Sequence, residues 1–242
     1  MTSETLSQLA SGGTLRAAIN MANSLLVTGE TANGDPDGVA PDMARAIAER
    51  LGVGVSFVPF PTPGELADAV DGGAWDIGMI GAEPKRAETI AFTAAYVEIE
   101  ATYLVPAGSP LTTIEDVDRD GVRIAISGRS AYDLYLTRNL EHAELVRAQG
   151  VSGAAELFVA EKLDALAGLR PALTVEAGNL AGARVLDGQF TAIQQAVGTK
   201  RGNEEGAAFL ANFVEEAKTS GLIGRLIERH GVVGRLTVAP PA

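Results

Sequence analysis

Residues 75–106 read WDIGMIGAEPKRAETIAFTAAYVEIEATYLVP, and the fold can be predicted by working outward from this stretch. Residues 75–80 form a short apolar run typical of a buried strand. A polar loop with Arg86 follows, and residues 101–106 form a second apolar run that is expected to be extended. The stretch therefore predicts a strand, a charged loop and a second strand that leads out of the first domain.

The same order of elements occurs twice along the chain. The first copy predicts strands at 14–20, 55–60 and 75–80, with helices at 41–51 and 64–70. The second predicts strands at 121–127, 144–148 and 163–169, with helices at 130–140 and 153–159. Asp76 and Asp164 occupy the same place in the two copies. Two βαβαβ units in tandem predict an α/β protein with two lobes and mostly parallel sheets.

Two extended segments are expected to join the lobes. Residues 101–106 lead to the second lobe and residues 190–197 lead back, before two amphipathic helices at 203–220 and 222–230. We therefore assign residues 1–104 and 196–242 to lobe 1, and residues 105–195 to lobe 2. Because ligands of open α/β sheets bind at the carboxyl ends of strands, the expected site is a cleft between the lobes that closes by a hinge motion.

Composition excludes several functions. The 242 residues carry a net charge of −12, whereas a nucleic-acid-binding protein needs a basic face. The chain has no cysteine, and its two histidines, His142 and His230, lie far apart in sequence. Both histidines are expected on the surface of helices. No metal site or cofactor is therefore expected. No segment is long and apolar enough to span a bilayer, so no membrane insertion is expected, and we expect a monomer. An anionic ligand would need a local group of positive charges.

The first residues, MTSETLSQLASGG, lack the basic region and apolar stretch of a secretory signal. The expectation from this segment is a cytoplasmic protein, or an export signal that the sequence does not include.

The chain resembles the amino-acid-binding proteins of ABC transporters, solute-binding protein family 3, which have the type II periplasmic binding protein fold. The resemblance rests on the segment at 75–106, on GVRIAISGRSAYDLYL, on AIQQAVGTKRGNEE and on TSGLIGRLIERHG, in that order. It covers nearly the whole chain, and it implies a periplasmic protein that delivers a small solute to an ABC permease.

The resemblance also implies two anion-binding positions. Arg86 matches the arginine that binds the ligand carboxylate, for which a planar guanidinium is suited; the alternative is a surface arginine. Ser130 matches the hydroxyl at a helix entry of lobe 2, although Ser130 and Asp133 also form a capping box. Arg129 would add charge beside it or be exposed to solvent.

The polar loop departs from the family pattern. Gly81, Ala82 and Glu83 stand where the family has Ser and Thr, so contacts from this loop would come mainly from the backbone. Asn20, at the end of the first strand, stands where the family places residues that cover the ligand.

A second departure follows Asp164. Amino-acid binders carry an acidic residue about five positions later, which pairs with the ligand ammonium, whereas this chain has Leu169 and Arg170. An arginine there would repel an ammonium and favour a dicarboxylate or another anion. The alternative is that Arg170 faces solvent and that Glu98, Glu100 or Glu176 takes the ammonium.

The residues therefore predict a solute-binding protein, without enzymatic activity, that captures a small anionic or zwitterionic carboxylate for ABC import or sensing. The alternative is a lyase similar to the cyclohexadienyl dehydratases of the same fold, with Glu83, Glu98 or Glu100 as its acid.

Overall fold

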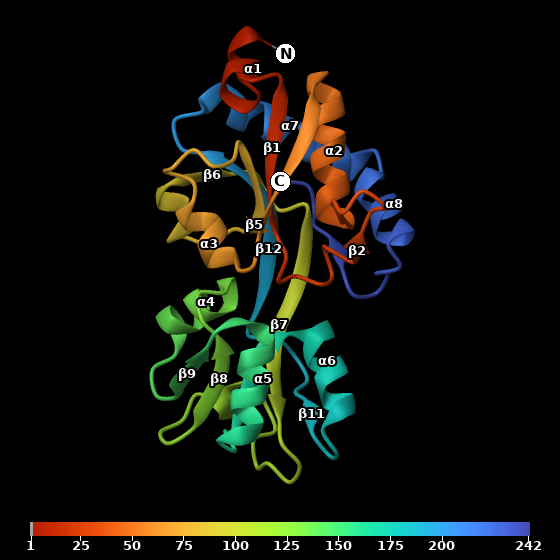
Figure 1. Ribbon diagram of the computed structural model, residues 1–242. Coiled ribbons are helices and arrows are strands. Elements are labelled where there is room, and N and C mark those ends of the chain that lie inside the picture. Colours follow the sequence, from red (N-terminus) through yellow and green to blue (C-terminus); the bar gives the residue numbers. More distant parts are fainter. Residues whose placement is uncertain (1) are drawn as a thin grey trace. The chain divides into compact units, whose positions relative to one another are not determined.

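A computed structural model describes residues 2–242, and the chain divides into two compact units. Unit 1 comprises Met1–Glu98 and Gln194–Ala242, and unit 2 comprises Ile99–Ile193. The chain passes from one unit to the other within two strands, β7 (Val97–Val105) and β12 (Thr191–Lys200) (Figure 1). Among the described residues, no helix is long and apolar enough to cross a membrane.

Unit 1 is built on a sheet with the strand order β4-β1-β5-β12. Strands β4 (Gly54–Phe60), β1 (Thr14–Asn20) and β5 (Ile77–Gly81) are parallel, and β12 runs antiparallel to β5. Short strands extend the ladder: β6 (Ile90–Phe92) pairs with β12, and β13 (Thr237–Val238) pairs with β7. A separate two-stranded ribbon contains β2 (Gly29–Glu30) and β3 (Pro36–Asp37).

Helices cover both faces of this sheet (Figure 1). α2 (Val39–Leu51) packs on β1 and β4 with a stripe at helical spacing, including Met43 and Ile47. α3 (Pro63–Asp68) packs on β1 and β5, where Leu66 and Trp75 belong to one apolar cluster. The remaining helices are α1 (Ser3–Leu9), α7 (Glu204–Thr219) and α8 (Leu222–Arg229). α1 contacts α7, and α8 contacts α2 and α7.

Unit 2 repeats the plan on a smaller scale. Strands β8 (Arg123–Ser127), β9 (Glu144–Ala148) and β10 (Ala165–Leu169) are parallel in the order β10-β8-β9, and β10 and β11 (Arg184–Val185) run antiparallel to β7. The helices are α4 (Ala131–Asn139), α5 (Gly150–Ala160) and α6 (Arg170–Asn179). Ile124 and Ile126 belong to the apolar cluster beneath α4, and Ala125 belongs to the cluster beneath α5 and α6. The alternation shows that the helices cover opposite faces of the sheet.

The two copies predicted from sequence are confirmed by equivalent hydrogen bonds. The Asp76 N–H donates to Arg16 O at 2.9 Å, and Asp76 Oδ2 accepts the Arg16 N–H at 2.8 Å. In unit 2 the Asp164 N–H donates to Arg123 O at 3.0 Å, and Asp164 Oδ2 accepts the Arg123 N–H at 2.8 Å. Each aspartate therefore ties the start of the third strand of its copy to the start of the first.

Sequence reasoning missed α6 altogether. Pro171 follows Arg170 in the first turn of this helix, where proline is well tolerated because its missing N–H would have no partner within the helix. Helix α2 also begins two residues before the predicted start at 41. The expectation that both histidines lie on the surface is wrong for His230. Its side chain is only 5% exposed because it packs against Asp42 of α2.

Candidate functional site

In unit 1, predicted ligand-binding residues gather at the carboxyl ends of β1 and β5. Because these strands are parallel, with Ile19 opposite Met79, Asn20 and Gly81 end at the same edge of the sheet. Asn20 Oδ1 accepts the Ala22 N–H at 3.2 Å, so its side chain also stabilises the turn that follows β1.

Arg86 is a buried cation next to this edge. It begins a short 3₁₀ turn, Arg86–Glu88, and is 5% exposed, which excludes the alternative of a surface arginine. Its Nη1 donates to the carbonyl oxygen of Gly81 at 2.7 Å. The hydrogen bond holds the guanidinium against the end of β5, where a ligand of a parallel sheet is expected.

The backbone of the loop after β5 is partly committed to the sheet. The Ala82 N–H donates to Gln194 O at 2.7 Å, and Gly81 lies opposite Gln195 in the ladder with β12. Glu83 is 5% exposed, and its Oε2 accepts the Lys85 N–H at 2.8 Å. The loop thus places a buried carboxylate three residues before the buried Arg86.

In unit 2, the start of α4 has the geometry of an N-terminal cap. Ser130 Oγ accepts the Asp133 N–H at 3.1 Å, so the capping role that the sequence suggested is present. The cap satisfies the third helical N–H. Ala131 and Tyr132 are the first two residues of α4, where N–H groups have no partner within the helix and the dipole favours an anion.

Arg129 precedes this cap in a conformation that side chains other than glycine rarely adopt. Its φ is 61°, in the left-handed region, and its N–H donates to Asp133 Oδ2 at 2.7 Å. Asp133 is itself buried, and its Oδ1 accepts from Arg147 Nε at 2.9 Å. The buried carboxylate of Asp133 therefore stabilises the strained backbone at Arg129. Such strained backbone is common where its geometry serves a function.

Tyr132 lies buried beside the cap. Burial raises the pKa of its phenol, and hydrogen bonds with Ser130 and Ser127 partly offset the increase. The phenol is therefore neutral at physiological pH. It contributes to the apolar cluster beneath α4 and has a hydroxyl at the helix start.

Arg170 lies at the same sheet edge as the α4 start, because β8 and β10 are parallel and α6 begins directly after β10. Its Nε donates to Glu100 Oε2, its Nη1 donates to Leu186 O at 3.2 Å, and its Nη2 donates to Gly188 O. All three partners belong to unit 2. The positive charge of Arg170 at this edge is thus paired with the negative charge of Glu100.

Sequence reasoning did not single out Gln195, a buried polar residue of unit 1. It lies opposite Gly81, and among the described residues its Oε1 has no hydrogen-bond partner. Two consecutive glutamines in the otherwise apolar run at 190–197 were a signal that could have directed attention to it.

One further cluster of unit 1 has the residue types of a metal site. Ligand atoms of Asp37, Asp42 and His230 lie within 4.8 Å of one another. However, Arg45 Nη1 already lies 2.8 Å from Asp42 Oδ1, and Arg229 Nη1 lies 3.3 Å from Asp42 Oδ2. Two guanidinium groups on one carboxylate would repel a divalent cation, so the cluster is better described as an ion-pair network that joins α2 to α8.

The sequence profile of the bacterial extracellular solute-binding proteins, family 3, matches residues 19–232. The chain belongs to this family. The match spans both units and includes every predicted ligand-binding residue. The comparison with curated proteins gave no match.

Solved structures of family 3 type share the fold. A mutant of ArgBP from T. maritima superposes with a TM-score of 0.76 at 19% identity, covering 94% of this chain and 99% of its own. An amino acid ABC transporter substrate-binding protein from Streptococcus pneumoniae, bound to L-arginine, gives 0.75 at 19% identity, with 97% and 99% covered. The ancestral amino-acid-binding protein AncCDT-1, a precursor of cyclohexadienyl dehydratase, gives 0.75 at 24% identity, with 93% and 98% covered. The protein therefore has the predicted type II periplasmic binding protein fold.

Proposed function

We propose that this family 3 protein binds a small carboxylate-bearing solute between its two units and closes around it by a hinge motion. The observation that carries the proposal is the burial of Arg86 against the end of β5. A planar guanidinium offers paired N–H donors that match a carboxylate, and ligands of parallel sheets bind at the carboxyl ends of strands, so a buried arginine at this position suits a carboxylate ligand.

The second half of the proposed site is the start of α4. Ser130, its neighbour Arg129 and the first N–H groups of the helix form a positive end that can hold the same carboxylate. Asn20, Gly81, Ala82 and Glu83 would line the unit 1 side. Because Ala82 N–H already donates to Gln194 O, we expect Gly81 and Ala82 to shape the site more than to donate hydrogen bonds.

The ligand class depends on Arg170. The ion pair between Arg170 and Glu100 makes this sheet edge of unit 2 close to neutral. A neutral edge is compatible with an α-amino acid as the ligand. We propose that a second ligand carboxylate competes with Glu100 for Arg170, so that the protein accepts dicarboxylates as well. Replacing Arg170 with glutamine would then reduce dicarboxylate affinity tenfold or more and leave amino-acid affinity within a factor of two or so.

The proposal can be tested by calorimetry and thermal unfolding against amino acids, dicarboxylates and aromatic acids. A ligand at 100 times its Kd stabilises the folded protein by about 2.7 kcal/mol. For a protein of this size that corresponds to an increase in Tm of roughly 5–10 °C.

Arg86 variants identify the site. Arg86→Gln should abolish binding, whereas Arg86→Lys keeps the charge but loses the bidentate geometry, and should weaken binding strongly. Lys85→Ala is the matched control, because Lys85 is the adjacent cation and its exposed side chain forms an ion pair with exposed Glu88. Unchanged affinity in folded Arg86→Gln would remove Arg86 from the site.

An alternative is lyase activity on the same fold, which the likeness to AncCDT-1 brings to attention. Such a reaction needs a carboxylic acid that can donate a proton. Buried Glu83 is the candidate in unit 1, but its oxygen accepts the Lys85 N–H, which suits a carboxylate. Incubation with prephenate and arogenate tests this alternative, and turnover would contradict binding without chemistry.

We further propose that the protein acts outside the cytoplasmic membrane and presents its ligand to an ABC permease. The description of its family as extracellular supports this location. Fractionation of cells that express the native gene would test it, since recovery only in the cytoplasm would favour a sensor.

A further inference from the structure

Helix α5 of unit 2 has apolar residues on its solvent-exposed side as well as on its buried face. Ala154 and Phe158 point into the cluster beneath the helix, and α5 contacts β8, β9 and β10. Yet Val151 is 44% exposed and Val159 is 51% exposed on the outside. A surface helix normally carries polar residues on its outer face, so two exposed valines on one helix mark a candidate contact surface.

The neighbouring helix α6 contributes to the same surface. Val175 is 65% exposed, so three of the four large exposed apolar residues among those described lie on α5 and α6. Figure 1 shows the two helices side by side on unit 2. They border a groove of about 500 Å³ lined by Ser152, Ala155, Glu156, Val159, Ala160 and Glu176.

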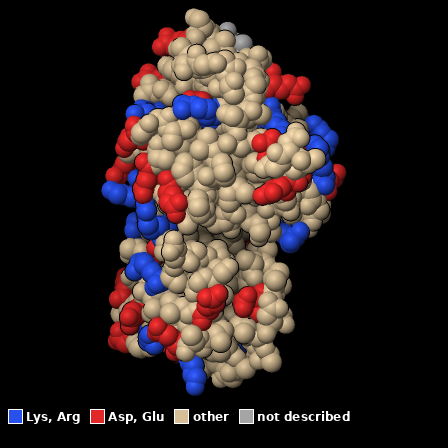
Figure 2. Space-filling model, in the orientation of Figure 1, with Lys and Arg blue, Asp and Glu red and all other residues tan. Residues whose placement is uncertain are grey.

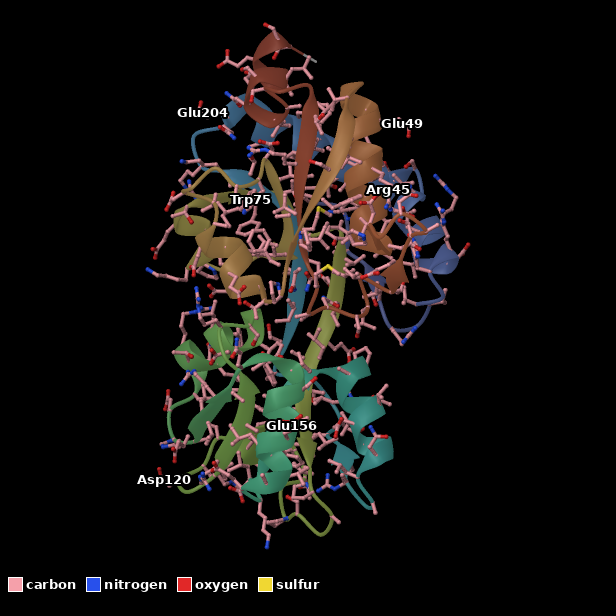
Figure 3. All side chains as sticks on the ribbon, viewed as in Figure 1. Arg45, Glu49, Trp75, Asp120, Glu156 and Glu204 are labelled. Carbon is pink, nitrogen blue, oxygen red and sulfur yellow. The ribbon has the colours of Figure 1, made fainter. Side chains whose placement is uncertain are left out.

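The charge of this α5–α6 groove restricts its occupant. Glu156 and Glu176 are its only charged lining residues, and neither side-chain carboxylate has an ion pair or hydrogen bond among the residues that the structure describes. In Figure 2 the surface around these helices is mostly tan with isolated acidic side chains, and Figure 3 marks Glu156 on α5. Two unpaired carboxylates on an apolar surface favour a partner with positive charges beside an apolar ridge.

Two other occupants fit less well. A second copy in a two-fold contact would bring the same carboxylates together, and like charges across an interface are unfavourable. An anionic lipid surface would be repelled by both carboxylates and by the net charge of −12.

We propose that the α5–α6 groove is a docking site for another protein, which inserts an apolar ridge flanked by Lys or Arg residues between Glu156 and Glu176. The site lies wholly within unit 2. It does not include any residue of the proposed ligand site, so it can be tested independently of the proposed solute-binding function. Glu176, which the sequence offered as a partner of a ligand ammonium, lines this groove.

The test uses fluorescent helical peptides and the full-length protein. The first peptide carries a leucine ridge flanked by lysines, the second has the same ridge flanked by glutamates, and the third keeps the lysines with a serine ridge. We expect only the first to bind by fluorescence anisotropy, with an affinity that falls as salt is raised.

Protein variants locate the binding. The double variant Glu156→Gln/Glu176→Gln should bind the first peptide roughly fivefold or more weakly than the native protein does. The double variant Val159→Ser/Val175→Ser should weaken this binding to a similar extent. Glu156, Val159 and Val175 are exposed and Glu176 is half-buried, so the variants are expected to fold, and their solute binding and Tm serve as checks. Glu204→Gln with Glu205→Gln removes the same charge from exposed positions of α7 in unit 1 and should leave the peptide affinity unchanged.

Several results would overturn the proposal. They are absence of peptide binding, equal binding of the lysine and glutamate peptides, and equal affinity for the groove variants and the α7 control. Concentration-dependent dimers that the valine substitutions abolish would assign the groove to a second copy. Binding to phosphatidylglycerol vesicles that the valine substitutions abolish would assign it to a membrane.

Discussion

Asp42 should be among the most costly carboxylates of unit 1 to remove. Its oxygens contact His230 Nε2 at 2.8 Å, Arg45 Nη1 at 2.8 Å and Arg229 Nη1 at 3.3 Å. These contacts join the first turn of α2 to the end of α8, and the side chains of Asp42 and His230 are almost fully buried. Asp42→Asn keeps the shape but removes the charge that holds the three partners together.

The expected loss can be estimated from the geometry. Breaking a fully buried ion pair by removing one partner costs about 3–5 kcal/mol. The arginines are partly exposed, Arg229 to 68%, so their share is screened by water. We therefore expect Asp42→Asn to reduce the free energy of unfolding by about 2–3 kcal/mol, or Tm by roughly 5–10 °C.

The assay can be confined to unit 1, because Trp75 is the only tryptophan of the chain and is buried there. Urea unfolding followed by Trp75 fluorescence gives the midpoint and slope for this unit. Asp37→Asn is the matched control: it removes the same charge from the same network, but Asp37 is more exposed and lies 3.8 Å from Arg45. It should cost no more than about 0.5 kcal/mol.

The stability that Asp42→Asn removes should decrease at low pH. Burial by itself would raise the pKa of Asp42, but hydrogen bonds from His230 and Arg45 outweigh it and hold the pKa below its usual value. A depressed folded-state pKa contributes stability that is fully present above the unfolded value of about 3.9. The difference between the native protein and Asp42→Asn should therefore shrink as the pH falls below about 4.

Two outcomes would refute this reasoning. If Asp42→Asn costs no more than Asp37→Asn, the buried network does not stabilise unit 1. If the difference between the native protein and Asp42→Asn grows as the pH falls below 4, the pKa of Asp42 is raised and not lowered.

Three further substitutions test the backbone and the core. Gly38→Ala should prevent unit 1 from folding, since a Cβ would lie 2.3 Å from Leu26 O at a φ of 146°; recovery of native Trp75 fluorescence would contradict this. Gly198→Ala places a Cβ 2.4 Å from Ile90 Cγ2, and the urea midpoint should fall by the equivalent of about 1–3 kcal/mol, whereas an unchanged midpoint would mean that Ile90 can move away freely. Arg129→Gly relieves a φ of 61° and should raise the calorimetric stability of unit 2 by up to about 1 kcal/mol. A loss of stability would show that the Arg129 side chain contributes more than its strain costs.

Much of the fold follows from local pattern. The strand at 14–20 was predicted to the residue, and the two βαβαβ copies were found because apolar periods and glycine stops recur in the same order. The buried state of Arg86 could be anticipated only through the family resemblance, since KRAE by itself reads as an exposed turn. Helix α6 was missed because Pro171 is compatible with both a helix start and a strand end.

The sequence by itself determined the fold class and the repeat, because these depend on periodicity and on short-range order. Only the tertiary structure decided the partners of each charge. It joined Arg170 to Glu100, buried His230 on Asp42, and left Gln195 Oε1 without a hydrogen-bond partner within residues 2–242. The physical reason is that side-chain pairing joins residues far apart in sequence, such as Asp42 and His230 at 188 positions, and no local pattern encodes which of them meet.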